Sequence, residues 1–176
     1  MYSFFYVLMK VITGDHRAQA DRDARRLTEG LALMQQYRHR EALIFFSDFL
    51  KQEPRCALAL VKRGACQLAL GEPFLALGDS RRAAEIDHVI MEAYLVAGQA
   101  LYELDDFLSA KVEFDKAVWY DRKNPEVYRR RGLNYLRMKD HVRATEDLRQ
   151  AIALGDEDAN YYLRRHRLHV KRYNPK

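Results

Sequence analysis

The chain has 176 residues and a mass of 20.7 kDa, enough for one domain with its own core and too little for two ordinary ones. Apolar residues make up 48% and charged residues 31%, which excludes a disordered tail and a membrane bundle. The 30 Lys and Arg against 25 Asp and Glu give a net charge of +5, which suggests nucleic acid or an acidic surface as a partner.

An apolar stretch opens the chain, since nine of the eleven residues from Tyr2 to Ile12 are apolar. It is shorter than the roughly 20 apolar residues that cross a bilayer. A secretory signal is disfavoured, because Lys10 interrupts the stretch and no basic residue precedes it. Only Cys56 and Cys66 are present, too few for a disulfide framework, so we expect a reducing, cytoplasmic location. Residues 1–14 are predicted to form an apolar arm that docks on the fold or mediates self-association.

Small residues then recur with a period of 34. Four glycines stand 34 residues apart, at Gly30, Gly64, Gly98 and Gly132. Each is followed twelve residues later by an alanine, at Ala42, Ala76, Ala110 and Ala144. A glycine inside a helix costs about 1 kcal/mol relative to alanine, so four in register indicate close helix packing. We expect each missing Cβ to lie opposite a small alanine of the neighbouring helix.

Two amphipathic helices fit within each unit of this period. In the third unit, apolar residues recur at helical spacing over 91–104 and again over 107–120, with Asp105 and Asp106 between them. Two helices alone cannot bury such faces, so the units must stack. The predicted domain layout is a repeat region over 15–158 with units at about 23–56, 57–90, 91–124 and 125–158.

The pattern resembles the tetratricopeptide repeat (TPR) family, whose 34-residue unit is a helix–turn–helix with the signature W-x2-L-G-x2-Y, A-x3-F and P. In the third unit the signature reads Tyr94, Ala97-Gly98, Leu101, Ala110 and Phe114. The first unit departs most, with Arg26 and Glu29 in the aromatic and leucine columns. The resemblance implies an all-α, right-handed α-solenoid of four TPR-like repeats with a C-terminal capping helix.

The resemblance also implies a concave groove lined by the successive first helices, which receives a partner peptide or helix. The lining positions lie three residues before, one residue after and four residues after each glycine, with Leu58 one turn earlier. The residues expected to line the groove are Leu27, Leu31, Met34, Leu58, Val61, Leu68, Leu95, Gln99, Tyr102, Arg129, Leu133 and Leu136. There are two alternative occupants of this apolar face, a partner polypeptide and the chain's own residues 1–13.

Some family members hold the acidic C-terminus of heat-shock chaperones with a carboxylate clamp of Lys, Asn and Arg side chains. The corresponding columns here hold Leu27, Leu31, Lys62, Glu92 and Val96. Without those donors a terminal carboxylate loses its charge-assisted hydrogen bonds. The clamp is therefore expected to be absent.

The last segment, residues 159–176, is basic and is predicted to be the capping helix and tail. It holds six basic residues and no acid, whereas residues 1–158 hold 24 basic and 25 acidic residues and are close to neutral. Its basic candidates for contact with RNA or an acidic surface are Arg164, Arg165, Arg167, Lys171 and Arg172. A charged cap of the repeat array is the favoured interpretation.

No catalytic signature accompanies the repeats. The spacing of His166 and His169 suits a helical metal pair, but no thiol or carboxylate joins them, and a solvated basic helix is favoured. We therefore predict a non-enzymatic scaffold that needs no cofactor or metal and binds another protein in its groove. The alternative is an adaptor that binds RNA or an acidic surface through the basic tail.

Overall fold

The computed structural model describes residues 25–173, with side chains through Arg165, so the predicted arm over residues 1–14 lies outside the described residues. Between residues 25 and 173 helices are the only regular elements. Their bounds are α3 Thr28–Gln35, α4 His39–Gln52, α5 Ala57–Ala69, α6 Pro73–Ile86, α7 Met91–Glu103, α8 Phe107–Tyr120, α9 Pro125–Arg137, α10 His141–Ala153 and α11 Glu157–Tyr173.

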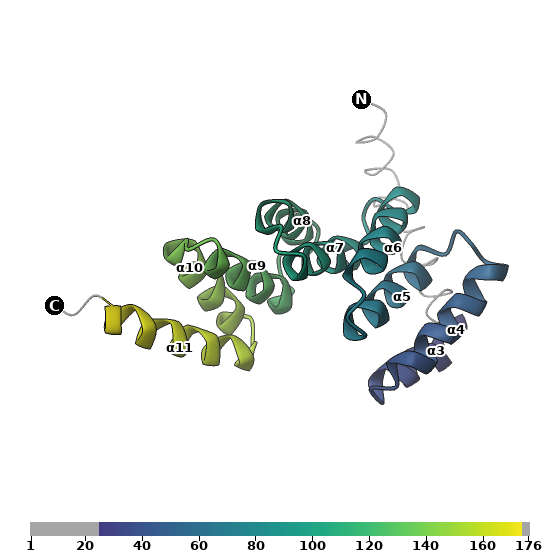
Figure 1. Ribbon diagram of the computed structural model, residues 1–176, viewed down its shortest axis with the longest axis horizontal. Helices are drawn as coiled ribbons and strands as arrows, with labels where there is room; N and C mark the ends of the chain where they lie inside the picture. The colour runs from purple at the N-terminus through teal and green to yellow at the C-terminus, as the bar shows by residue number, and fades with distance from the viewer. Residues whose placement is uncertain (1–24, 174–176) are drawn as a thin grey trace, which may run out of the picture.

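Helices that follow one another in sequence pack as antiparallel neighbours. The hairpins are α3/α4, α5/α6, α7/α8 and α9/α10, and the first helices α5, α7 and α9 also contact one another in turn. Figure 1 shows the hairpins following one another from α3 and α4 at one end to α11 at the other. The predicted fold class, an all-α solenoid, is confirmed.

The turn inside each hairpin has the same geometry. One residue takes a left-handed conformation, namely Tyr37, Gly71, Asp105 or Lys139, each 34 residues after the last. The residue after it donates its N–H to the carbonyl five residues back, as Asp140 does to Tyr135 at 2.9 Å. This 6→1 bond defines a Schellman C-cap, which ends the first helix and reverses the chain. Only Gly71 has the residue type that this conformation favours.

The glycine column packs differently from the expectation. A Cβ built on Gly98 would lie 2.7 Å from the Phe114 ring, and one on Gly30 would meet the Phe45 ring first and the Phe46 ring at 2.7 Å. Thus the glycines make room for the large residue sixteen positions later, and not for the alanine twelve positions later. Gly64 is the exception, because the residue sixteen positions after it is the small Ser80. A Cβ built on Gly64 would lie 3.3 Å from both the Ala76 carbonyl oxygen and the Val96 side chain.

The alanine columns form the centre of each hairpin. Ala42, Ala76, Ala110 and Ala144 have no exposed surface. At the end of the array, Ala159 and Leu163 of α11 are buried in one cluster with Leu148 and Ala151 of α10. The helix α11 therefore covers the outer edge of the last hairpin.

Candidate partner-binding groove

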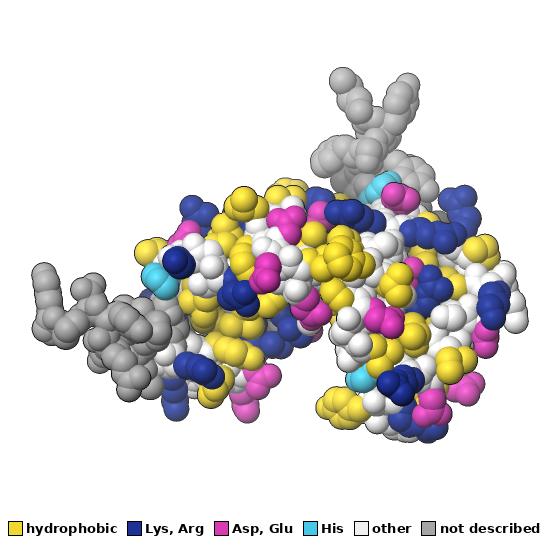
Figure 2. Space-filling model, in the orientation of Figure 1, with side chains coloured by type: hydrophobic (Ala, Val, Ile, Leu, Met, Phe, Trp, Pro, Cys, Tyr) yellow, Lys and Arg dark blue, Asp and Glu magenta, His cyan; other side chains and the backbone are white. Residues whose placement is uncertain are grey.

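A concave pocket of about 510 Å³ lies against the first helices of the hairpins. It draws Met34 from α3, several residues from α5 and α7, and Glu126 and Arg130 from α9. In Figure 2 the outline of the molecule is hollowed between the α3–α5 end and the α9–α11 end. Residues from all four repeat units therefore line the pocket.

Five of the twelve predicted groove residues line this pocket. They are Met34, Val61, Leu68, Leu95 and Gln99. Leu27 has no exposed surface and belongs to the core cluster of the first two hairpins. Leu31 and Leu58 are half-buried against the same cluster, and Leu136 packs beside α10 and α11.

The three remaining predicted residues, Tyr102, Arg129 and Leu133, are not among those that line the pocket. The Tyr102 ring packs edge-on against Phe107 at 5.7 Å between centroids, with the Arg137 guanidinium 5.5 Å from its centroid. Arg129 forms an ion pair with Asp156 at 2.7 Å, and Leu133 is half-buried.

Eight further residues line the pocket, and the repeat offsets indicate three of them, Ala65 in the groove and Glu92 and Glu126 beside it. The eight are Lys62, Ala65, Ala69, Glu92, Val96, Glu103, Glu126 and Arg130. Apart from Ala65, which lies in the predicted column one residue after each glycine, they fall in columns two and six residues before each glycine and five residues after it. The repeat period contains this signal, but only the crossing of the helices shows which columns face inward.

The arginines of the first helices α5 and α9 are all paired with carboxylates. Outside the pocket, Arg63 binds Asp79 through two bonds of 2.6 Å, Arg131 binds Asp147, and Arg137 binds Asp105. Inside it, Arg130 donates twice to Glu126 at 3.2 Å. These cations are therefore already neutralised by the protein itself.

Among these pairs, Arg131 links two repeat units. It donates to Asp147 of its own hairpin at 2.7 and 2.8 Å and to Asp115 of the preceding hairpin at 2.8 Å. Burial alone would lower the pKa of Arg131, but hydrogen bonds to Asp147 and Asp115 outweigh it and raise that pKa. Burial raises the pKa of the Asp147 carboxyl in spite of this contact. The guanidinium is therefore a structural cross-link between the third and fourth units.

The outer helices carry exposed apolar side chains. On α4, α6, α8 and α10 the large apolar residues that face solvent are Ile44, Phe74, Leu75, Leu108, Val112, Trp119 and Val142. Phe74, Leu108 and Val142 occupy equivalent positions at the start of successive outer helices. Figure 2 shows apolar side chains at the surface over α6 and α8. Apolar surface is thus present on both faces of the array.

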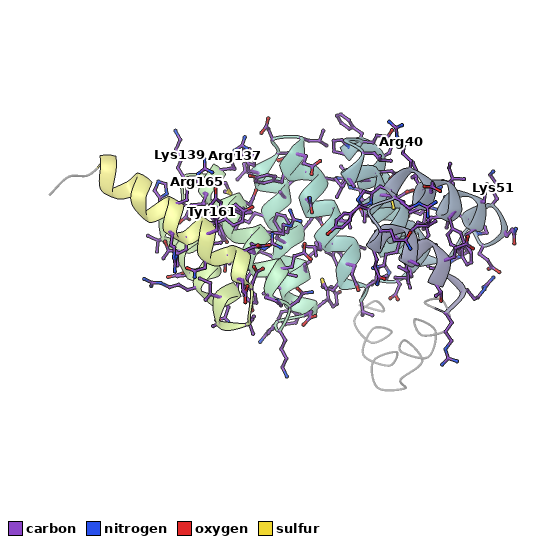
Figure 3. All side chains as sticks on the ribbon, turned by 90° about the horizontal axis from the view of Figure 1, so that it is seen from below. Arg40, Lys51, Arg137, Lys139, Tyr161 and Arg165 are labelled. Atoms are coloured by element: carbon purple, nitrogen blue, oxygen red, sulfur yellow. The ribbon has the colours of Figure 1, made fainter. Side chains whose placement is uncertain are left out.

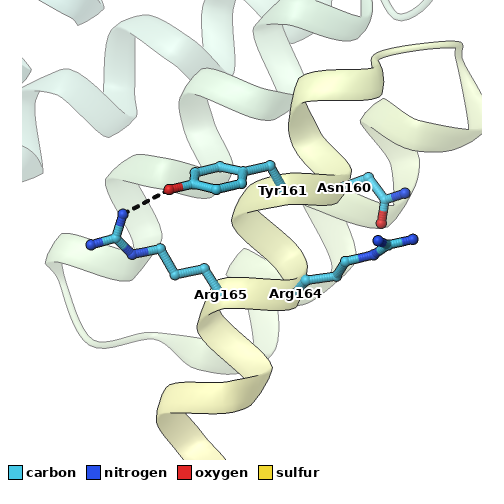
Figure 4. A pocket seen from close by; sticks show the side chains of 4 residues that line it. All are labelled: Asn160, Tyr161, Arg164 and Arg165. Carbon is cyan, nitrogen blue, oxygen red and sulfur yellow. Dashed lines mark hydrogen bonds between the residues drawn. The ribbon is translucent and has the colours of Figure 1, made fainter.

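The basic residues of α11 lie at the opposite end of the array from those of the first hairpin. Figure 3 shows Arg40 and Lys51 at one end and Tyr161 and Arg165 at the other. Arg164 and Arg165 are exposed, and with Asn160 and Tyr161 they line a depression of about 440 Å³ (Figure 4). Arg165 donates to the Tyr161 hydroxyl at 2.9 Å. The structure does not describe the side chains of the other predicted basic residues, Arg167, Lys171 and Arg172.

Among the side chains described, those of residues 25–165, no three His, Cys, Asp or Glu gather as a metal site requires. No helix in the described part of the chain combines the length and the apolar character that crossing a membrane demands.

Comparison with known protein families found no family model that matches the chain. A curated relative, outer dynein arm-docking complex subunit 4 of Xenopus laevis, is 30% identical over 90 residues, which are 51% of this chain. The match spans 17% of that relative's length.

Several solved structures share the architecture. TTC0263, a TPR protein of Thermus thermophilus, has a TM-score of 0.77 at 23% identity, covering 85% of this chain and 84% of that one. MamA 41-end from Desulfovibrio magneticus RS-1 has a TM-score of 0.69 at 15% identity, covering 85% and 86%. The first TPR of Spaghetti (RPAP3), bound to the HSP90 peptide SRMEEVD, has a TM-score of 0.61 at 21% identity, covering 65% and 92%. The chain therefore has the tetratricopeptide-repeat fold.

Proposed function

We propose that the protein is a non-enzymatic scaffold that binds a peptide or helix of another protein in its concave groove. The observation that carries this proposal is the pocket of about 510 Å³ formed by α3, α5, α7 and α9. Its lining is apolar along α5 and α7, with Ala65 and Leu68 half-buried and Val61 and Leu95 buried, and five charged side chains also line it. A lining that combines apolar and charged side chains is the usual composition of a peptide-binding surface. A chain with two cysteines, both buried, suits a reducing compartment, so we place the protein in the cytoplasm.

A peptide display experiment with a matched pair of variants tests groove binding. A random peptide library is selected on the whole chain, and the enriched peptides are measured against Ala65→Trp and Ala153→Trp. Ala65 lines the pocket, whereas Ala153 is exposed at the end of the outer helix α10. We expect Ala65→Trp to abolish binding and Ala153→Trp to leave it unchanged, with both variants retaining native helicity. Peptides that bind the two variants equally well would contradict the proposal.

We further propose that the groove lacks the carboxylate clamp. The neighbour bound to SRMEEVD holds an acidic peptide. Here Lys62 is the one cation in the five clamp columns, and Glu92 places a carboxylate where the clamp has a cation. We expect no micromolar binding of SRMEEVD by fluorescence polarisation, and saturable micromolar binding lost in Ala65→Trp would refute this.

The exposed arginines of α11 support a second candidate function, which is binding of RNA or an acidic surface. Arg164 and Arg165 flank Tyr161, which is 58% exposed and has a ring able to stack on a base. Truncation before α11 would remove Ala159 and Leu163 and expose Leu148 and Ala151, which they bury, so point variants are the better test. Arg164→Gln with Arg165→Gln should weaken binding of a single-stranded RNA in a gel-shift series and reduce its salt dependence. Unchanged binding would remove α11 as the site.

A further inference from the structure

The charges inside the groove specify the chemistry of its partner, an inference that rests on the proposed groove function. The pocket is lined by three carboxylates, Glu92, Glu103 and Glu126, and by two cations, Lys62 and Arg130. Glu126 and Arg130 neutralise each other through two contacts of 3.2 Å. One cation and two carboxylates remain for a partner.

The remaining carboxylates are not neutralised by the described part of the protein. Among the side chains of residues 25–165 neither Glu92 nor Glu103 has an ion-pair partner, and Glu103 accepts one hydrogen bond, from the Gln99 amide at 3.3 Å. The surrounding arginines cannot compensate, because Arg63, Arg129 and Arg131 are held by Asp79, Asp156 and Asp147. The groove therefore has apolar side chains from α5 next to unpaired carboxylates from α7.

We propose that the partner is a cationic amphipathic segment, with apolar side chains over α5 and Lys or Arg side chains at Glu92 and Glu103. These two glutamates are eleven residues apart on α7, an axial separation of about 16 Å. A helical segment of about 14 residues, roughly 21 Å long, reaches both carboxylates. An acidic segment would place its own charges against them.

Two synthetic 14-residue amphipathic peptides test this. They share the same leucine positions, and one has lysine and the other glutamate at every polar position. Fluorescence anisotropy at low salt should show the lysine probe binding more tightly. Glu92→Gln with Glu103→Gln should weaken the lysine probe by about 2- to 30-fold, since two partly exposed charge pairs are lost. Glu85→Gln with Glu146→Gln is the matched control on the exposed outer helices and should have no effect.

The outcomes separate this inference from groove binding itself. Equal affinities, or no change in the Glu92→Gln, Glu103→Gln double variant, would overturn the cationic partner. If Ala65→Trp still abolished lysine-probe binding in that case, the groove proposal would stand. Absence of any binding sensitive to Ala65→Trp would overturn both. A glutamate probe that bound at α11 more tightly than the lysine probe binds the protein, unaffected by every groove variant, would also count against the inference.

Discussion

Single glycines decide how closely the two helices of a hairpin approach. The Phe114 ring lies 2.7 Å from the position that a Cβ of Gly98 would take, and this ring is fully buried. Gly78 is also inside a helix, but no atom lies within 4 Å of the Cβ it lacks. Replacing these two helical glycines with alanine should therefore have opposite effects on stability.

We expect Gly98→Ala to lower the free energy of unfolding by about 1–3 kcal/mol, because the new methyl group overpacks against Phe114. Gly78→Ala should raise it by about 0.5–1 kcal/mol, since alanine is the better helix former and has open space. Urea denaturation followed by circular dichroism measures both. A stabilising Gly98→Ala would contradict the packing described here.

Burial also controls the chemistry of Cys66. The thiol has no exposed surface, and burial raises its pKa from 9.0 to about 11. The unfolded chain loses this proton at lower pH, so the stability that the Cys66 thiol contributes is lost as the pH rises from about 9 to 11. At pH 8 in a Cys56→Ala background, we expect a disulfide reagent to modify native Cys66 at least about 100-fold more slowly than unfolded Cys66. A native rate within tenfold of the unfolded rate would show that the thiol is accessible.

Whole helices, by contrast, follow from the sequence period. The 34-residue period predicts hairpins whose alanines are fully buried, because small residues at helical spacing indicate close contact between helices. The alanines are indeed fully buried. The inward face is less predictable, since it depends on how neighbouring helices cross. The column three residues before each glycine contains Leu27 and Val61, at 0% and 1% exposure, so it packs mainly between helices. Arg129 is in the same column but pairs with Asp156, 27 residues away, which periodicity does not reveal.

Ion pairs between elements vary in value with burial. The Arg131 and Asp147 side chains are 17% and 9% exposed, whereas Lys51 and Asp48 are 77% and 62% exposed. Arg131→Met should destabilise the fold by about 3–5 kcal/mol, because it leaves Asp147 buried without its partner. Lys51→Met should change stability by less than about 1 kcal/mol.

The double variant Arg131→Met with Asp147→Leu is the control for this prediction, because it removes both charges. It should recover most of the loss in thermal and urea denaturation. If Arg131→Met alone were as harmless as Lys51→Met, the cross-link between the third and fourth units would have no energetic role.

At the scale of the molecule, the net charge of +5 misrepresents the binding surface. The excess of basic residues belongs to residues 159–176, whereas the groove retains two carboxylates without ion pairs among the described residues. Exposed apolar side chains occur on the outer helices as well, including Phe74, Leu108 and Trp119. The face that binds a partner is therefore the central question for this protein.

A titration of the ¹⁵N-labelled chain with the lysine probe, followed residue by residue by NMR, answers it most directly. We expect the amide shifts to concentrate on the inner helices α5 and α7, from Val61 to Ala69 and from Glu92 to Glu103, and to saturate with one affinity. Shifts concentrated on the outer helices near Phe74 and Leu108, or on α11 near Arg164, would contradict groove binding.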